Sequence, residues 1–407
     1  MEWKEVRLGD VCEIYGRIGF RGYTTNDLVD TPKEGAISLS PKNIINGELN
    51  LDQCTYIKWD KYYESPEIMI NPNEIIITKT GSSVGRTTFV RRVVHPMTLN
   101  PQLVLLKNIS ENAEFLSYYI KSALFQSVLK SIVVGSAIPT LSQKNLANLI
   151  INVPKEVAYQ HRIASILSSL DRKIELNNKI NADLEEMAQA IFKNWFVDFE
   201  PFKDGKFVDS ELGMIPEGWK VGRLTEIASY MNGLAMQKFP PENNEESLPV
   251  LKIKELGQGF CGTDSDRCSC NIKDECKIHN GDVIFSWSGT LLVDVWCGGD
   301  CGLNQHLFKV TSKDYPKWFY YYWTKHHLQE FIHIAKDKAV TMGHIKRGHL
   351  EEALVAIPDN NSMEKAHELF EPILSKMISL RLENSRLSLL RDTLLPRLMS
   401  GELEVPE

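Results

Sequence analysis

The sequence predicts an α+β fold in which two α/β domains form a tandem pseudo-repeat, separated by two long helices that form an antiparallel coiled coil. Three observations support this prediction. Residues 155–200 carry a long apolar seam without glycine or proline. A second seam of the same phase lies near the end of the chain. Each seam follows a globular block, and the two blocks repeat their motifs in the same order.

The first block, residues 1–154, has short apolar and β-branched runs separated by turn signals, a pattern typical of strands. A helical run is expected near 115–133. The expected strands are 74–78, 87–90, 103–106 and 149–153. The block therefore indicates an α/β domain that ends at Pro154, directly before the long seam.

The seam within 155–200 repeats at steps of four and three residues, which is the pattern of a coiled-coil helix. A helix of roughly 40 residues would be roughly 60 Å long and would need a partner along its length. A long amphipathic helix in one large core is the alternative. The predicted seam residues are Ile163, Leu167, Leu170, Ile174, Asn177, Asn181, Leu184 and Ile191.

Residues 201–218 are rich in proline, glycine and charge, which predicts a linker. The second block, residues 219–357, then repeats the motifs of the first. The repeated motifs begin at Trp3 and Trp219, at 73 and 281, and at 136 and 340. This internal repeat predicts a second domain with the same plan as the first.

A second long helix and a C-terminal tail are predicted for 358–407, because the first seam maps onto this stretch. Pro372 is expected to kink or begin this helix, and Pro396 to end it. One globular block precedes each helix, so antiparallel pairing would place one block at each end of the pair. The predicted seam residues are Phe370, Ile373, Met377, Leu380, Asn384, Leu387 and Leu394.

Three asparagines occupy seam positions: Asn177, Asn181 and Asn384. A polar residue in a coiled-coil seam usually fixes the register of the helices at some cost in stability. We expect these residues to have that role. The alternative is that they face solvent at a frayed seam.

The chain has 407 residues and a formal net charge of −7, which neither supports nor excludes a nucleic-acid partner. Its start lacks an apolar signal core, and no uncharged apolar run approaches the roughly 20 residues of a membrane helix. We therefore expect a cytoplasmic protein. The cysteines between Cys261 and Cys301 are expected to be reduced, and no metal site is predicted, with a structural zinc site as the alternative.

The loop after the expected strand at 74–78 is flanked by Gly81 and Gly85. It differs from a nucleotide-binding P-loop because its glycines are one residue too close, Arg86 replaces the lysine, and a β-branched run follows. Its side chains are suited to donate hydrogen bonds to phosphates or base edges, and a tight structural turn is the alternative. The candidate residues are Lys79, Ser82, Ser83 and Arg86.

The matching loop of the second block has an aromatic residue in place of the basic ones, which indicates that the two blocks bind different ligands. Asn and Gln side chains can pair bidentately with adenine, and the turns near 137–144 and 341–347 add cations. Ordinary polar turns are the alternative. The candidates are Trp287, Ser288, Thr290, Asn304, Gln305 and His306, with Thr140, Gln143, Lys144, His344, Lys346 and Arg347 in the two later turns.

The sequence shows no recognisable catalytic constellation. A base methyltransferase would need an Asn/Asp-Pro-Pro-aromatic loop, and the Asn-Pro-Asn at 71–73 differs from it. His161 and His306 have no evident nucleophile beside them. The aromatic run at 315–323 predicts a core-facing helix, with base stacking as the alternative.

The chain resembles the specificity subunits of Type I restriction-modification enzymes. Residues 163–178 and 194–199 are similar to the central repeated segment of that family, and 390–403 to its distal one. The resemblance extends over the whole chain. The implied organisation is target-recognition domain 1 (1–154), a central spacer helix (155–200), a linker (201–218), target-recognition domain 2 (219–357), and a distal spacer helix with a C-terminal tail (358–407).

The resemblance implies that each target-recognition domain reads one half of a bipartite double-stranded DNA target. It implies a chain without catalysis or cofactors of its own. The helix pair would set the spacer and dock two modification (methyltransferase) subunits that use S-adenosylmethionine, while restriction (translocase/nuclease) subunits use ATP and Mg²⁺. No membrane partner is implied. The alternatives are a single-chain DNA methyltransferase or nuclease, and a coiled-coil protein-binding scaffold.

Overall fold

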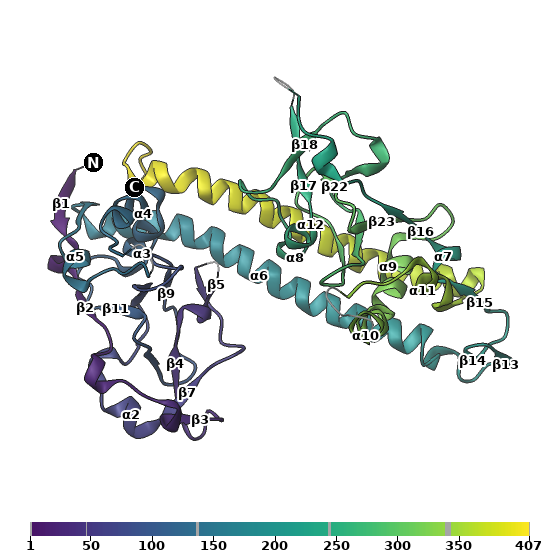
Figure 1. The fold of residues 1–407 in the computed structure, drawn as a ribbon, viewed down its shortest axis with the longest axis horizontal. Helices are drawn as coiled ribbons and strands as arrows, with labels where there is room; N and C mark the ends of the chain where they lie inside the picture. Colours follow the sequence, from purple (N-terminus) through teal and green to yellow (C-terminus); the bar gives the residue numbers. More distant parts are fainter. Residues whose placement is uncertain (1, 46, 136–137, 243–245, 338–342, 407) are drawn as a thin grey trace. The chain divides into compact units, whose positions relative to one another are not determined.

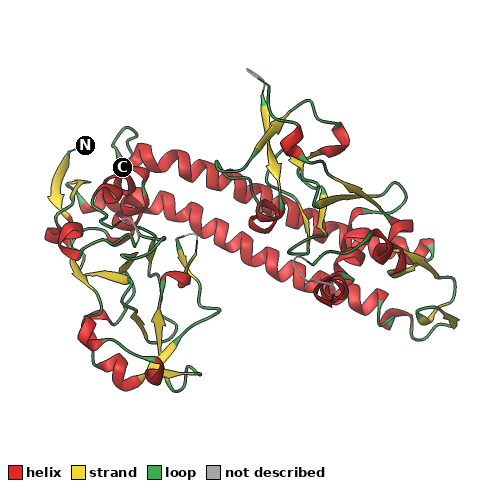
Figure 2. Cartoon of the chain, viewed as in Figure 1, coloured by secondary structure: helices red, strands yellow, loops and turns green. Residues whose placement is uncertain are grey.

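A computed structural model describes residues 2–45, 47–135, 138–242, 246–337 and 343–406 (Figure 1). The chain forms two compact units, which are described separately. Unit 1 is Met1–Arg172 with Ser388–Glu407, and unit 2 is Lys173–Leu387. Each unit contains one mixed helix and sheet domain, part of the 40-residue helix α6 (Val157–Phe196) and part of the 40-residue helix α12 (Asn360–Met399) (Figure 2). None of the described helices is long and apolar enough to cross a membrane.

The domain of unit 1 is built on two sheets and a strand pair. The strand pair joins β1 (Trp3–Arg7) to β12 (Ile150–Pro154) in antiparallel fashion. One sheet has the antiparallel order β2-β11-β8-β9, and the other has the order β10-β4-β7-β3 with β10 and β4 parallel. Their bounds are β2 (Glu13–Tyr15), β3 (Leu28–Val29), β4 (Gly35–Leu39), β7 (Tyr56–Lys58), β8 (Ile75–Thr78), β9 (Thr87–Phe89), β10 (Met97–Leu99) and β11 (Leu103–Lys107).

Alternating side chains of β8 explain how the two sheets pack. Ile75 and Ile77 lie in the core beneath the helices, whereas Ile76 lies in the core between the sheets. Successive strand residues point to opposite faces, so a strand covered on both faces is apolar throughout. The expected strands of this block are present in the structure.

The helical run expected near 115–133 is divided into α3 (Ala113–Lys121) and α4 (Ala123–Ser131). The division falls at Ser122, whose backbone is extended and whose hydroxyl accepts a hydrogen bond from the amide of Phe125 at 3.3 Å. Serine favours this capping role over a helix interior. The remaining short elements of unit 1 are α1 (Leu8–Val11), α2 (Trp59–Tyr63), α5 (Gln143–Ala147), β5 (Ile44–Ile45) and β6 (Glu48–Leu49).

Unit 2 repeats the plan of unit 1, as the internal repeat predicts. β15 (Lys220–Arg223) pairs with β24 (Leu354–Ile357), one sheet has the antiparallel order β16-β23-β20-β21, and the other has the order β18-β17-β22-β19 with β17 and β22 parallel. The other bounds are β16 (Ser229–Asn232), β17 (Ser247–Leu251), β18 (Arg267–Ser269), β19 (Lys277–Ile278), β20 (Val283–Ser286), β21 (Leu292–Val295), β22 (Cys301–Leu303), β23 (Leu307–Thr311), α7 (Leu224–Ile227), α8 (Ile253–Gln258), α9 (Lys317–His326), α10 (Leu328–Asp337) and α11 (Arg347–Glu352).

The aromatic run near 315–323 forms most of α9, and its side chains from Trp318 to Trp323 are buried in the core of unit 2. These aromatic side chains are therefore core residues, which confirms the core-facing helix predicted from the sequence. Residues 201–218 form a hairpin of β13 (Phe207–Ser210) and β14 (Gly213–Pro216). Phe202 packs edge-on against Trp219 at 4.9 Å between ring centroids, which ties this segment to the domain.

The two long helices pair in antiparallel fashion, as predicted. In unit 2, Asn177 of α6 donates to Asn384 of α12 at 2.8 Å, while Phe192 lies beside Phe370 with ring centroids 6.3 Å apart. Higher numbers on one helix thus meet lower numbers on the other. In unit 1, Arg391 of α12 contacts Asp171 of α6 at 2.8 Å.

The predicted seam residues are all buried or partly buried in the structure. Ile163, Leu167, Asn177, Asn181, Phe370, Met377 and Leu380 are buried, and Leu170, Ile174, Leu184, Ile191, Ile373, Asn384, Leu387 and Leu394 are partly buried. Near α9, Phe192 and Leu374 are buried, each one position beyond the partly buried Ile191 and Ile373. A straight helix of 3.6 residues per turn drifts against a 3.5-residue repeat, and α9 adds a second surface there.

The expectation that Pro396 ends the second helix is wrong, because α12 continues to Met399. Proline removes its own N–H but keeps its carbonyl, which accepts from the amide of Ser400 at 3.0 Å. Burial of Leu398 and Met399 in unit 1 favours this last turn. Pro372 lies inside α12, which begins at Asn360.

Candidate nucleic-acid interface

Main-chain contacts hold the loop between β8 and β9 in unit 1. The amide of Lys79 donates to the carbonyl of Gln102 at 2.8 Å, and the carbonyl of Lys79 accepts from the amide of Leu141 at 2.7 Å. Thr80 and Thr140 form an isolated β-bridge. Three segments far apart in the sequence therefore meet at Lys79, and the contacts use backbone atoms, which any side chain allows.

The same frame recurs in unit 2 around the loop between β20 and β21. The amide of Trp287 donates to the carbonyl of His306 at 3.4 Å, and the carbonyl of Trp287 accepts from the amide of Ile345 at 3.1 Å. Ser288 and His344 form the matching β-bridge. Trp287 thus takes the place of Lys79. We call each of these three-segment arrangements a loop frame.

An asparagine turn completes both loop frames. The side-chain oxygen of Asn100 accepts from the amide of Gln102 at 2.9 Å, and that of Asn304 accepts from the amide of His306 at 3.3 Å. Asn304 is a sequence candidate, whereas Asn100 and Gln102 are not. The signal that identifies them is the pattern Leu-Asn-x-x-Leu, which occurs at 99–103 and again at 303–307.

The side chains on the loop frame of unit 1 are basic and polar. Lys79 is partly buried, and this burial lowers the pKa of its ammonium group. Lys79, Thr140 and Gln143 line a pocket of about 390 Å³ together with Arg17, which the sequence patterns do not single out. Ser82, Arg86 and Lys144 are exposed and Ser83 is partly buried, all outside this lining.

The β8–β9 turn depends on Gly81 and Gly85, whose φ angles are +103° and +89°. Side chains with a Cβ rarely adopt such angles. A Cβ at Gly85 would also lie 2.8 Å from the side-chain oxygen of Gln126. The glycines therefore fulfil a backbone requirement of a tight turn, and the side chains between them project from it.

The loop frame of unit 2 is aromatic and amide-rich. The Trp287 ring lies 5.9 Å from that of His306 and 6.4 Å from that of His344. Asn304, Gln305 and His306 line a pocket of about 430 Å³. Its further lining residues, which sequence reasoning missed, include Gln237, Lys252, Asp266 and Arg267.

The remaining candidates of unit 2 lie around this loop frame. Ser288 is buried, and Thr290, Lys346 and Arg347 are exposed. Lys346 and Arg347 lie at the start of α11 and outside the pocket lining. Parts of the two later turns, residues 136–137 and 340–342, fall outside the described residues.

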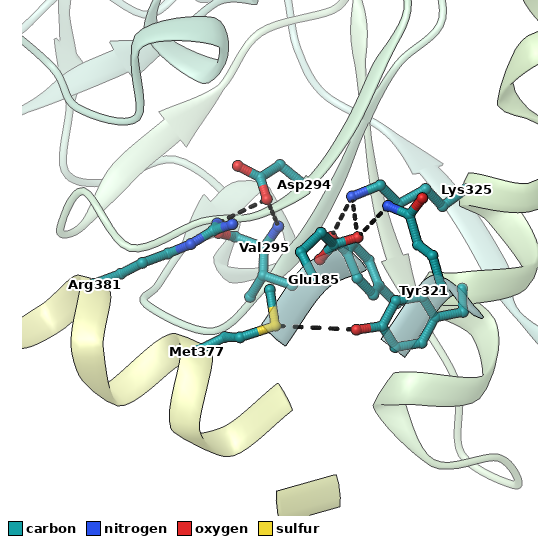
Figure 3. A network of polar contacts seen from close by, with 9 residues as sticks. Glu185, Asp294, Val295, Tyr321, Lys325, Met377 and Arg381 are labelled. Atoms are coloured by element: carbon teal, nitrogen blue, oxygen red, sulfur yellow. Dashed lines mark hydrogen bonds and ion pairs between the residues drawn. The ribbon is translucent and has the colours of Figure 1, made fainter. Parts of the chain in front are cut away.

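Polar contacts attach each domain to the long helices in its own unit. In unit 2, Lys325 of α9 meets Glu185 of α6 at 2.5 Å, and Arg381 of α12 meets Asp294 of β21 at 2.7 Å (Figure 3). In unit 1, the hydroxyl of Tyr118 on α3 donates to Asp171 at 2.6 Å. Partly buried hydrogen bonds and ion pairs of this kind resist small rotations of a domain on its helices.

The cysteines of the second domain are free thiols. Across the described ranges, no group of three or more His, Cys, Asp or Glu side chains is placed to hold a metal ion. Cys261 and Cys301 form a hydrogen-bonded pair in which Cys301 lowers the pKa of the Cys261 thiol.

The sequence of this chain is similar to those of known proteins. The family model of the Type I restriction modification DNA specificity domain matches residues 1–186 and 216–384. The Type I restriction enzyme MjaIX specificity subunit of Methanocaldococcus jannaschii is 28% identical over 428 residues, covering 100% of this chain and 94% of the relative. The Type I restriction enzyme HindI specificity subunit of Haemophilus influenzae is 21% identical, covering 99% of this chain and 100% of the relative.

A crystal structure of the S subunit of a Type I restriction-modification system from M. genitalium has a similar fold. It aligns with a TM-score of 0.55 at 15% identity, over 98% of this chain and 96% of that chain. The two matches of the family model fall on the two halves of the internal repeat. The chain therefore belongs to the family of Type I restriction-modification specificity subunits and carries two DNA specificity domains in tandem.

Proposed function

We propose that this chain is the DNA-recognition subunit of a Type I restriction-modification complex and that each domain reads one half of a bipartite target. The observation that supports this most directly is the duplicated loop frame, with Gln102 in one copy and His306 at the equivalent place in the other. Equivalent backbone frames present their side chains at equivalent places. Unlike side chains at those places would select unlike base sequences, since specificity comes from contacts to base edges.

We also propose that the paired helices set the gap between the half-sites and dock two modification subunits. Half-sites read from one face of a duplex lie about one helical turn, 34–36 Å, apart. A constant gap requires domains that keep their orientation on the helices. The contacts of Lys325 with Glu185 in unit 2 and of Tyr118 with Asp171 in unit 1 support such attachment.

The chain is proposed to transfer no methyl group and to cut no DNA by itself. S-adenosylmethionine would be used by the modification subunits, which must extrude a base from the duplex to methylate it. ATP and Mg²⁺ would be used by restriction subunits. The relatives named as specificity subunits support this division of work, and a DNA target favours a cytoplasmic location.

The experiment that tests these proposals is methylome sequencing of a host that expresses the chain with its modification subunits. The expected result is a methylated motif made of two short half-sites with a constant unread gap. Methyl transfer by the purified chain alone would instead identify a single-chain methyltransferase. A complex that neither methylates nor protects such a motif would favour a protein-binding scaffold.

A matched pair of substitutions assigns the half-sites to domains. Trp287→Ala should change the bases accepted in one half-site and leave the other half-site unchanged. Gln102→Ala, in the loop frame of the other domain, should do the reverse. Loss of both half-sites in either variant would contradict independent reading by the two domains.

A further inference from the structure

Two cations share the pocket of unit 1 that is lined by Arg17, Lys79, Thr140, Ser142 and Gln143. Lys79 is partly buried, and within the described ranges no carboxylate forms an ion pair with it. Burial alone lowers the pKa of its ammonium group, which is the effect expected for a cation that loses water without gaining an anion.

Arg17 is 4% exposed, and its guanidinium bonds to neutral acceptors. Its Nε donates to the carbonyl of Leu99 at 2.8 Å, and its two Nη atoms donate to the carbonyl of Arg21 and the hydroxyl of Thr98, each at 3.1 Å. A guanidinium has five N–H donors, so donors remain beyond these three bonds.

The acids near Arg17 do not neutralise it by direct contact. Glu64 and Glu67 act on Arg17 at longer range, while Glu67 contacts Arg21 at 3.4 Å and Glu64 contacts Lys61 at 2.9 Å. Burial lowers the pKa of Arg17, and these acids together with Tyr23 raise it by a smaller amount. The charge of the pocket is therefore positive and largely uncompensated.

Uncompensated buried charge is unfavourable, so this pocket would gain free energy from an anionic ligand. We propose that it seats one phosphate of the DNA backbone at the half-site read by the first domain, an inference that rests on the proposed function. Thr140, Ser142 and Gln143 add neutral donors of the kinds that bond to DNA phosphates. Lys79 thus positions the DNA, while neighbouring side chains of the loop frame meet the bases.

The second domain differs at the equivalent point. Trp287 stands in place of Lys79, and the lysine of the neighbouring pocket, Lys252, is paired with Asp266. Arg267 of the same pocket is exposed and donates to Ser247, so this pocket offers amides and an imidazole ring without a buried, uncompensated cation. The two domains should depend differently on salt, because each phosphate contact releases counterions when DNA binds.

The test measures DNA binding by the complex of this chain with its modification subunits as a function of salt. Lys79→Gln should lower the slope of log K against log salt by about 1, which is the effect of one lost phosphate contact, without changing the bases selected. Lys79→Arg should keep the wild-type slope. Lys42→Gln, at an exposed lysine outside both pockets, is the control for loss of a general positive charge and should change the slope little.

Neutral methylphosphonate substitutions, placed one at a time along the half-site, locate the contact. One position should weaken wild-type binding and have no effect on the Lys79→Gln variant. Altered base preference with an unchanged salt slope would overturn the proposal and make Lys79 a base-reading residue. An unchanged slope with no sensitive phosphate would also overturn it. Absence of any bipartite target for the wild-type complex would instead refute the proposed function.

Discussion

Replacing Asn177, a buried asparagine of the helix pair, with leucine should stabilise unit 2 and loosen the register of its helices. Asn177 is fully buried, and its Nδ2 donates to Glu383 and Asn384, each at 2.8 Å. Its Oδ1 has no hydrogen-bond partner among the described residues. The side chain therefore combines two satisfied donors with one unsatisfied acceptor in an apolar seam.

The balance favours leucine. Loss of two hydrogen bonds costs about 0.5–1.5 kcal/mol each, and the partly exposed partners Glu383 and Asn384 can then bond to water. Removal of an unsatisfied buried carbonyl returns about 1–3 kcal/mol. Burial of a leucine side chain adds about 1.5–3 kcal/mol. The lost hydrogen bonds and the removed carbonyl roughly cancel, so Asn177→Leu should stabilise unit 2 by the burial contribution of about 1.5–3 kcal/mol.

Urea unfolding followed by tryptophan fluorescence is the assay for this change, because unit 2 holds most of the tryptophans. Trp3 and Trp59 lie in unit 1, and unit 2 contains Trp195, Trp219, Trp287, Trp296, Trp318 and Trp323. The midpoint should rise with an unchanged slope. Asn178→Ala, at an exposed partner of Asn384, is the control and should shift the midpoint little.

Register is the second readout. A polar seam residue disfavours slipped pairings, so its loss should broaden the distribution of gaps between half-sites in the methylated motif. Destabilisation by more than about 1 kcal/mol would refute the reasoning, because it would mean that both polar ends of Asn177 are satisfied. A single unchanged gap in a stabilised variant would refute the register role.

Three further predictions concern unit 2 and the thiols. Glu185→Gln should lower the urea midpoint by the equivalent of about 1–3 kcal/mol, because Lys325 then keeps an uncompensated, partly buried charge. Adding Lys325→Met should recover part of this lost stability. Stability losses that simply add in the double variant would contradict the pairing of Lys325 with Glu185. Burial lowers the pKa of His326, so its stabilising effect is complete above the ordinary pKa of about 6.5 and is lost as pH falls below that value through the lower pKa of the folded state. His326→Asn should flatten the stability difference between pH 7.5 and 5.5, and an unchanged difference would contradict the assignment. Iodoacetamide should alkylate Cys261 before Cys12, because the pKa of Cys261 is lowered, whereas burial raises the pKa of Cys12 to about 12. Mass spectrometry measures the order of alkylation, and the reverse order would contradict this prediction.

The predictable part of the fold was its periodicity. Strand runs, the long seams and the repeat follow from local spacing, and each has a counterpart in the structure. The predictions that the structure corrects depend on single residues and on the packing around them. Ser122 divides one predicted helix by capping the next, and Pro396 is tolerated because the residues after it find a core in unit 1.

The sequence predicts the candidate site at positions where the two copies of the repeat carry different residues. Lys79 and Trp287 stand at matching places in the two copies, so the patterns single out both. Arg17 was missed because its place beside Lys79 arises from folding, and no spacing relates the two positions. Gln102 was within reach of pattern analysis, since its motif recurs in the second block.

The loop frames have a consequence for how new targets can arise. Their defining contacts join backbone atoms, so replacing the side chain of Gln102, Trp287 or His306 removes none of those bonds. Most substitutions that change function also consume stability, and marginal stability limits how many a protein tolerates. In the loop frames, stability depends on backbone atoms, whereas the choice of DNA sequence depends on side chains. A lineage could therefore exchange one side chain after another at these positions and explore new DNA sequences while the domain stays folded.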